Sequence, residues 1–217
     1  MHRLHRLCHL LLVVLLAACS SRTGASGAFQ QGKEYTLATH AAAPADGHKV
    51  LVQEFFWYGC PHCFAFDPTL REWVRQIPRD VSFERVPATL GRPVGVLHAR
   101  AFYIAQILRV SDSIHIPLFE AIHEGGRPLE TLDDLRSFFG EKALVAATAF
   151  DVAANDPLVE SRLRRADELA RNYGVTGVPT MVVDGRYLTD GGMAGDFSRM
   201  LQVVDFLVEK ARKERKL

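Results

Sequence analysis

The chain has 217 residues, of which 48% are hydrophobic and 24% are charged, and its formal net charge at pH 7 is +1. This near-neutral balance offers no general basis for nucleic-acid binding. The length suits one globular domain, or one domain with a large insertion, and either is able to bury a hydrophobic core.

The first eighteen residues have the pattern of a secretory signal peptide. Arg3 and Arg6 give a positive start, residues 10–16 form a short apolar run, and small residues complete a cleavage site. The apolar run is far below the ~20 residues that a transmembrane helix needs, so we expect no permanent membrane span here. Removal of residues 1–18 takes away both arginines and changes the formal net charge from +1 to −1.

Cys19 follows at the position that bacterial lipoproteins modify. Residues 16–19 (LAAC) resemble the lipobox, whose cysteine carries the lipid, and the Gly- and Ser-rich composition predicts a flexible tether over residues 19–33. The alternative is an ordinary signal peptide cut near Ala18, with Cys19 as an incidental thiol. By resemblance to Gram-negative lipoproteins, Ser20 after the cysteine favours the outer membrane.

Processing simplifies the cysteine count. Of the four cysteines, Cys8 leaves with the signal and Cys19 would carry lipid, so Cys60 and Cys63 remain as thiols. Export places them in an oxidising compartment, where disulfides persist. A bridge between two such close residues constrains the unfolded chain little, so we expect the pair to serve chemistry rather than stability.

Three strands are predicted ahead of a long helical region. Residues 34–39 alternate weakly and predict an edge strand, whereas the nearly continuous apolar run 49–57 is typical of a strand buried on both faces. Residues 81–86 alternate again and predict the third strand. Between the last two, a helix is expected to begin at Cys60-Pro61, since proline is tolerated in a first turn. Pro68 is expected to kink this helix or to end its first part.

The next part of the chain is predicted to be all-helical. Gly140 and the pair at 125–126 are expected to break it, and Asp156-Pro157 joins an N-cap residue to a favourable first helical position. Apolar periodicity predicts helices at residues 96–110, 114–124, 132–139, 141–154 and 157–173.

A hairpin and a final helix complete the predicted order. Residues 180–188 read as two short strands around an Asp-Gly turn, and residues 197–210 carry an apolar helical stripe. Without the helical block, this order is that of the thioredoxin fold. We therefore predict an α/β protein in which a thioredoxin-like domain contains an inserted all-helical domain. The thioredoxin-like domain takes residues 34–95 and 174–217, and the insertion takes residues 96–173.

The Cys-Pro-His-Cys motif at residues 60–63 carries the predicted chemistry. At a helix start, the Cys60 sulfur faces unpaired N–H groups and the positive end of the helix dipole, and both favour the thiolate. Pro61 and His62 lie between the cysteines, and His62 adds a donor or a charge. Because the thiolate is the reactive species, Cys60 is the predicted attacked sulfur and Cys63 the resolving thiol.

Two other interpretations of the motif are a structural disulfide and half of a zinc site. Structural zinc sites take four ligands, and the chain beyond the signal has no second C-x-x-C and no close H-x-x-x-H. No metal site is therefore predicted. The remaining histidines have no ligand spacing and are predicted to be surface or satisfied core residues: His40, His48, His98, His115 and His123.

From about Gly32 onward, the chain resembles the DsbA proteins, which are thioredoxin-fold oxidants that donate disulfides to newly exported proteins. The resemblance rests on Glu54, on residues 55–66 (FFWYGCPHCFAF), on the helical block and on residues 174–184 (GVTGVPTMVVD). It implies an acidic thiol, no bound cofactor, and re-oxidation by a DsbB-like, quinone-linked membrane protein. Pro68 and the predicted lipid anchor depart from the family pattern.

The resemblance also implies roles for residues outside the motif. Pro179 is expected to follow a cis peptide bond that turns the backbone of Val178 towards a substrate peptide, with Gly177 and Thr180 beside it. The alternative is a proline that merely starts a strand. Glu54 is expected to lie beneath the second cysteine and to move its proton, with a pKa raised by desolvation; the alternative is an edge position in water.

The sequence thus predicts a monomeric periplasmic oxidoreductase that donates its disulfide to exported cysteine-containing proteins. A disulfide isomerase or reductase is the closest rival. Isomerases of this superfamily carry a dimerisation domain for which residues 20–33 are too short, and reductases usually lack so large a helical insertion. A lipid-anchored chaperone or binding module with an inert disulfide is the rival from another class. Tyr58 and Gly59 are expected to border the substrate groove.

Overall fold

The computed structural model describes residues 29–41 and 47–217. The predicted signal peptide, Cys8 and the predicted lipidation site Cys19 lie outside these residues. In chain order the elements are β1 (Thr36–Leu37), β2 (Val50–Phe56), α1 (Pro61–Gln76), β3 (Val81–Pro87), α2 (Pro93–Ile107), α3 (Ser111–His123), α4 (Leu132–Ala143), α5 (Ala147–Ala154), α6 (Pro157–Tyr173), β4 (Thr180–Val183), β5 (Tyr187–Asp190), α7 (Gly191–Ala194) and α8 (Phe197–Arg215).

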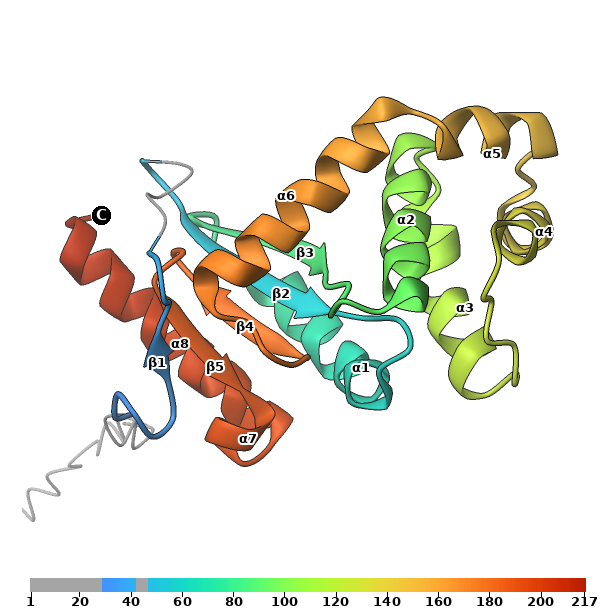
Figure 1. Cartoon of the computed structure of the whole chain (residues 1–217). Coiled ribbons are helices and arrows are strands. Elements are labelled where there is room, and N and C mark those ends of the chain that lie inside the picture. The colour runs from blue at the N-terminus through green and yellow to red at the C-terminus, as the bar shows by residue number, and fades with distance from the viewer. Residues whose placement is uncertain (1–28, 42–46) are drawn as a thin grey trace, which may run out of the picture.

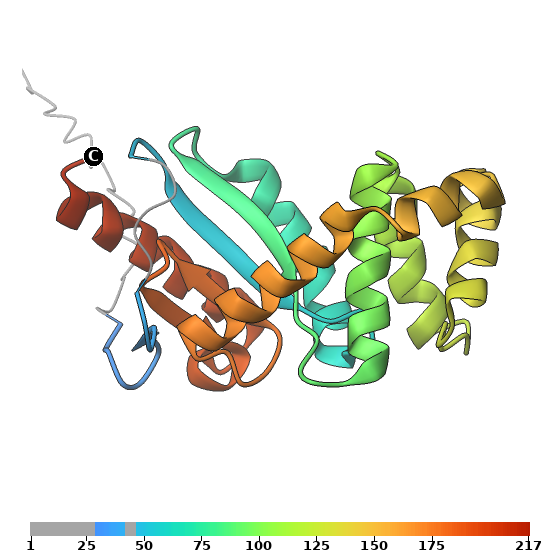
Figure 2. The ribbon, with the colours of Figure 1, turned by 45° about the horizontal axis from the view of Figure 1, so that its top comes forward.

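The five strands form one mixed sheet in the order β1-β5-β4-β2-β3. β2 and β3 are parallel, whereas β2 with β4, β4 with β5, and β1 with β5 are antiparallel. Helices α1 and α8 cover one face and α6 crosses the other, while α2 to α5 form a separate helical block beside the sheet (Figures 1 and 2). This confirms the predicted fold class, a thioredoxin fold with an inserted helical region.

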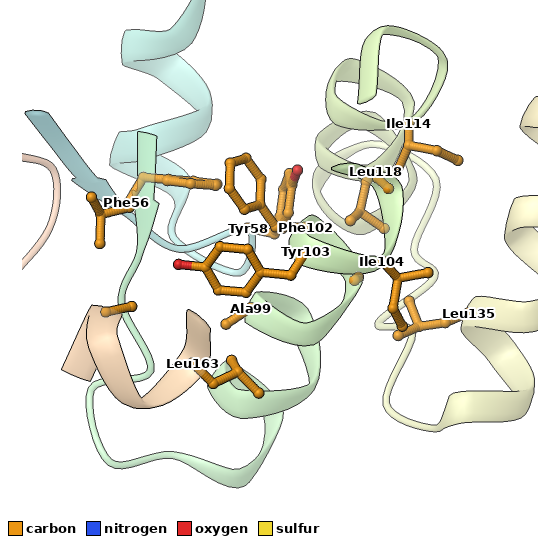
Figure 3. Packing of buried hydrophobic residues seen from close by; sticks show 14 of the residues in the cluster. Phe56, Tyr58, Ala99, Phe102, Tyr103, Ile104, Ile114, Leu118, Leu135 and Leu163 are labelled. Carbon is orange, nitrogen blue, oxygen red and sulfur yellow. The ribbon is translucent and has the colours of Figure 1, made fainter. Parts of the chain in front are cut away.

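The alternation of side chains along β2 explains why this strand is buried on both faces. Val50 and Val52 pack with α1 and α8, whereas the Phe55 ring meets Tyr173 of α6 edge-on, with ring centroids 5.9 Å apart. At the end of the strand, Phe56 joins the helical block. Figure 3 shows Phe56, Tyr58 and Phe102 grouped where β2 meets α2. The start of the Cys-Pro-His-Cys motif is therefore held between sheet and insertion.

The predicted helix break at Gly140 is wrong. Helix α4 runs through Gly140 and ends where Leu144 adopts a left-handed conformation, with φ of 55°. One glycine costs a helix only about 1 kcal/mol, and the capping box at the start of α4 together with the buried rings of Phe138 and Phe139 offsets that cost. Helix α1 continues through Pro68, which lies between the buried Phe66 and Leu70, so Pro68 does not end the helix; the kink at Pro68 stays a prediction.

The predicted tether overlaps the folded region. Phe29 packs edge-on against Phe206 of α8, with ring centroids 5.5 Å apart, and Arg199 lies over the Phe29 ring. The small-residue composition of residues 19–33 gave no indication that its one aromatic residue, Phe29, packs against α8. No helix within residues 29–41 and 47–217 is long and apolar enough to cross a membrane.

Candidate active site

Both motif cysteines lie at the start of α1 in the thiol form. Cys60 is the N-cap residue, and Pro61 is accommodated in the first turn. The Cys60 amide donates a 3.0 Å hydrogen bond to the Trp57 carbonyl, which closes a turn in front of the helix. Cys60 is 7% exposed and Cys63 is fully buried, so the two sulfurs differ in their access to a substrate.

The environment separates the acidities of the two thiols. The hydrogen bond from Cys63 lowers the pKa of Cys60 to about 6 against the opposing effect of burial, with further help from the backbone amides of Cys63 and His62 and from the His62 charge. Burial raises the pKa of Cys63 well above its ordinary value, and the neighbouring Cys60 raises it further. Cys60 is therefore the thiolate at neutral pH, and Cys63 keeps its proton.

The loop before β4 completes the site. The peptide bond between Val178 and Pro179 is cis, as the resemblance implied. When Cys60 is protonated, its thiol donates to the Val178 carbonyl across 3.4 Å. Thr180 is buried, and its hydroxyl donates to the Gly177 carbonyl at 2.8 Å, so this side chain supports the loop from within.

A groove of about 530 Å³ opens beside the sulfurs. It is lined by His62, residues 177–179, residues 190–192 and residues 195–197. Tyr58 and Gly59, which were expected to border it, do not line this groove. Tyr58 is only 1% exposed because its ring packs against Phe56 and Phe119.

Glu54 is buried in β2, at 2% exposure, and Arg85 is its charged partner. The Arg85 Nε donates to a Glu54 carboxylate oxygen at 3.1 Å, and its Nη2 donates to Asp67 at 2.9 Å. We call Glu54, Arg85 and Asp67 the charge cluster. Sequence reasoning missed Arg85 and Asp67. The parallel register that sets Glu54 opposite Arg85, and the one-turn spacing of Asp67 from Cys63, are the signals that point to them.

Burial raises the pKa of Glu54 to about 7, although the Arg85 charge opposes the shift and the Asp67 charge reinforces it. A carboxyl group with this pKa is partly protonated at neutral pH, so it is able to give or take a proton. The negative charge of ionised Glu54 also contributes to the raised pKa of Cys63, so the charge states of the two groups depend on each other.

The same pKa predicts that Glu54→Gln stabilises the reduced protein at alkaline pH. A folded-state pKa raised from 4.5 to about 7 means that the fold loses stability as pH rises from 4.5 to about 7, where Glu54 is ionised in the unfolded chain but still protonated in the folded one, and this loss is complete above pH 7. The amide avoids this charge, so the free energy of unfolding should exceed that of the wild type by up to about 3 kcal/mol above pH 7. The two proteins should converge below pH 4.5. Urea titrations at pH 4 to 9 measure the difference, and a constant difference would contradict the prediction.

No group of three or more histidine, cysteine or acidic side chains arranged to hold a metal occurs in the part of the chain that the structure describes.

The family described as "DSBA-like thioredoxin domain" matches residues 96–207. The thiol:disulfide interchange protein DsbA of Pseudomonas syringae pv. tomato is 40% identical over 183 residues, which cover 84% of this chain and 85% of the relative. The DsbA of Azotobacter vinelandii is 38% identical over 83% of this chain and 84% of its own.

Solved structures agree with the sequence relatives. The crystal structure of Pseudomonas aeruginosa DsbA aligns with a TM-score of 0.82 and 37% identity, over 87% of this chain and 97% of that one. DsbA from Xylella fastidiosa aligns with a TM-score of 0.77 and 35% identity, over 84% and 97% of the two chains. With a thiol pair of divided acidity at a helix start beside a cis-proline loop, the chain belongs to the DsbA family of thiol:disulfide oxidoreductases.

Proposed function

We propose that the Cys60–Cys63 disulfide oxidises cysteine pairs in newly exported proteins. A substrate thiolate attacks the Cys60 sulfur, a new S–S bond forms, and Cys63 leaves as a thiolate. A second substrate thiolate then attacks the substrate sulfur of this mixed disulfide and releases Cys60 as a thiolate. The substrate loses two electrons, which the enzyme holds as two reduced cysteines.

Glu54 is proposed to supply the proton for the leaving Cys63. The burial that makes a Cys63 thiolate costly also raises the pKa of Glu54 to about 7, so the neutral carboxyl group passes its proton to the Cys63 sulfur and the negative charge moves to Glu54, beside Arg85. Arg85 and Asp67 set the tendency of Glu54 to hold this proton. Pro61 and His62 are proposed to assist the release of Cys60 from the mixed disulfide, Pro61 by shaping the helix start and His62 by favouring the Cys60 thiolate.

The groove beside the sulfurs is proposed to hold the substrate peptide. Val178 has its carbonyl at the Cys60 sulfur, so an extended peptide bound along residues 177–179 would carry a cysteine to the point of attack. Thr180 is proposed to hold this loop through the Gly177 carbonyl. The groove wall is partly main chain, which suits substrates of varied sequence.

The location and partners follow from the same chemistry. We infer that the enzyme is periplasmic and monomeric, that lipid on Cys19 tethers it to a membrane, and that a DsbB-like quinone-linked oxidase restores the disulfide. Ser20 after Cys19 favours the outer membrane. Mass spectrometry of the protein purified from membranes would detect the lipid on Cys19.

The position of Cys60 as the N-cap of α1, hydrogen-bonded by Cys63 and by the first amides of the helix, is the observation that carries this proposal, because it lowers the pKa of Cys60, and a stabilised thiolate is a good leaving group and favours the reduced enzyme. The test is equilibration of the soluble domain with glutathione buffers, followed by alkylation and mass measurement of the free thiols. We expect the pair to be reduced even in strongly oxidising buffers. A pair that stays oxidised until the buffer is strongly reducing would favour a reductase or an inert disulfide.

A further inference from the structure

Three histidines of the helical insertion contact the segment that precedes Cys60. His98 of α2 accepts a hydrogen bond from the Trp57 indole at 3.1 Å. His123 of α3 bonds the Tyr58 carbonyl at 2.7 Å, and His115 of α3 bonds the Tyr58 hydroxyl at 2.8 Å. Three side chains from two helices of the insertion therefore bind this segment. Of the three, His115 also reaches the charge cluster.

The partners of His115 fix its protonation state. Its Nε2 lies 3.1 Å from an oxygen of Asp67, a carboxylate that only accepts, so this nitrogen carries the hydrogen. Nδ1 is then free to accept from the Tyr58 hydroxyl. Burial lowers the pKa of His115, and the nearby charges of Arg85 and Arg71 lower it further, although the Asp67 hydrogen bond opposes them. The imidazole is neutral, with a defined tautomer.

Asp67 is the point where His115 meets the cluster. Its Oδ1 accepts from both His115 and Arg85 Nη2, and its Oδ2 accepts from Arg71 at 2.8 Å. Burial alone would raise the pKa of Asp67, yet its pKa lies below its ordinary value, and the His115 hydrogen bond is the largest cause of this lowering. His115 thus satisfies a carboxylate that would otherwise depend more heavily on Arg85.

Arg85 is shared between two carboxylates, since Nε serves Glu54 and Nη2 serves Asp67. If Asp67 loses another hydrogen-bond donor, it interacts more strongly with Arg85, and the guanidinium moves away from Glu54. Glu54 then loses the charge that opposes its desolvation, and it holds its proton to higher pH.

We propose that His115 is a positioning residue for disulfide exchange, which acts through Asp67 and Arg85 to set the proton affinity of Glu54. The inference rests on the proposed role of Glu54 as the proton partner of Cys63. His115 makes no contact with the reacting sulfurs in this arrangement. Its effect is on the pH at which the buried acid changes charge, and hence on the pH range in which Cys63 is able to exchange a proton.

The surroundings of His115 allow it to be replaced by an apolar residue. His115 lies in the wall of a cavity of about 440 Å³, together with Arg71, Arg85 and Tyr58. Its ring also packs edge-on against Phe56 and Phe119. An apolar ring therefore suits the position, so His115→Phe removes the hydrogen bonds and retains most of the packing.

The experiment measures the carboxyl pKa of Glu54 by isotope-edited infrared or carbon NMR, with Glu54→Gln to assign the signal. The same proteins then give the pH profile of single-turnover exchange with a dithiol peptide. For His115→Phe we expect both the Glu54 pKa and the inflection of the profile to rise by about one pH unit. His115→Gln offers an amide N–H to Asp67, so we expect it to restore the wild-type values.

Two controls separate positioning from general stability. Tyr58→Phe removes the hydroxyl contact but keeps the contact of His115 with Asp67, so the Glu54 pKa should stay at its wild-type value. His40→Gln changes an exposed histidine and should leave both readouts unchanged. If His115→Phe does not fold, His115→Leu makes the same chemical change with a smaller side chain.

The outcomes distinguish the inference from the function on which it rests. If the wild-type profile has no inflection that Glu54→Gln removes, the proposed role of Glu54 fails. If the inflection is present but His115→Phe or His115→Leu leaves the Glu54 pKa unchanged, Glu54 keeps its role and the inference about His115 is overturned. A shift that His115→Gln fails to restore also overturns it, because the hydrogen bond to Asp67 would then not be its cause.

Discussion

Cys60→Ser is expected to abolish disulfide exchange, and Cys63→Ser to stop it at the mixed disulfide. Cys60 is the more exposed of the two described thiols, its sulfur lies 3.4 Å from the carbonyl of Val178 at the groove, and its pKa is lowered to about 6, so the buried Cys63 does not replace it as the attacked atom. In Cys63→Ser, the Cys60 thiolate attacks a disulfide of an oxidised substrate, forms a mixed disulfide and releases one substrate thiolate, but the internal thiol that would resolve this mixed disulfide is missing. Non-reducing gels of the purified, reduced variants with a substrate that contains a disulfide measure both results.

The matched pair of serine variants also separates the proposed function from that of a protein with an inert disulfide. A chaperone or binding module with an inert disulfide would keep its activity in Cys60→Ser, for example in suppressing substrate aggregation. An oxidase would lose substrate oxidation in both variants and accumulate the covalent complex in Cys63→Ser alone. Accumulation of the complex in Cys60→Ser instead would reverse the roles of the two cysteines.

The fold was predictable because its signals are local. The apolar run before the motif, the Pro61 helix start and the Asp-Gly hairpin each depend on a few neighbouring residues, and their order specifies the thioredoxin arrangement. The wrong break at Gly140 has the opposite cause, because burial of Phe138 and Phe139 outweighs a local preference worth only about 1 kcal/mol. Burial of Phe66 and Leu70 likewise keeps α1 continuous through Pro68.

The role of the two cysteines was predictable for the same reason. The side chains that surround the buried acid Glu54 were not. The position of Cys60 at a helix start already implies an acidic thiol. Glu54 was found as a charge within an apolar strand, but its partner Arg85 is 31 residues away, and the register of a parallel strand pair determines their contact. His115 lies 57 residues from Tyr58, so no spacing in the sequence indicates that an unremarkable histidine contacts the active-site segment.

The second large effect concerns the stability of the reduced protein as a function of pH. The folded-state pKa of Cys60 is lowered from 9.0 to about 6, so ionised Cys60 stabilises the fold. This stabilisation is complete above the unfolded pKa and is lost as pH falls through 6. The difference corresponds to about 4 kcal/mol in full, of which about 1 kcal/mol is present at pH 7. We therefore expect the reduced protein to gain stability over Cys60→Ala as pH rises from 5.5 to 9.

Urea titrations of reduced wild type and Cys60→Ala across this pH range measure the gain. Cys63 and Glu54 titrate in both proteins, so their contributions largely cancel in the difference. The oxidised protein has no Cys60 thiolate, and its stability should therefore fall behind that of the reduced form as pH rises. By the thermodynamic cycle that joins folding and reduction, this gap is the free energy that favours handing the disulfide to a substrate. A difference that stays constant with pH would remove the driving force for donation and leave the direction of exchange unexplained.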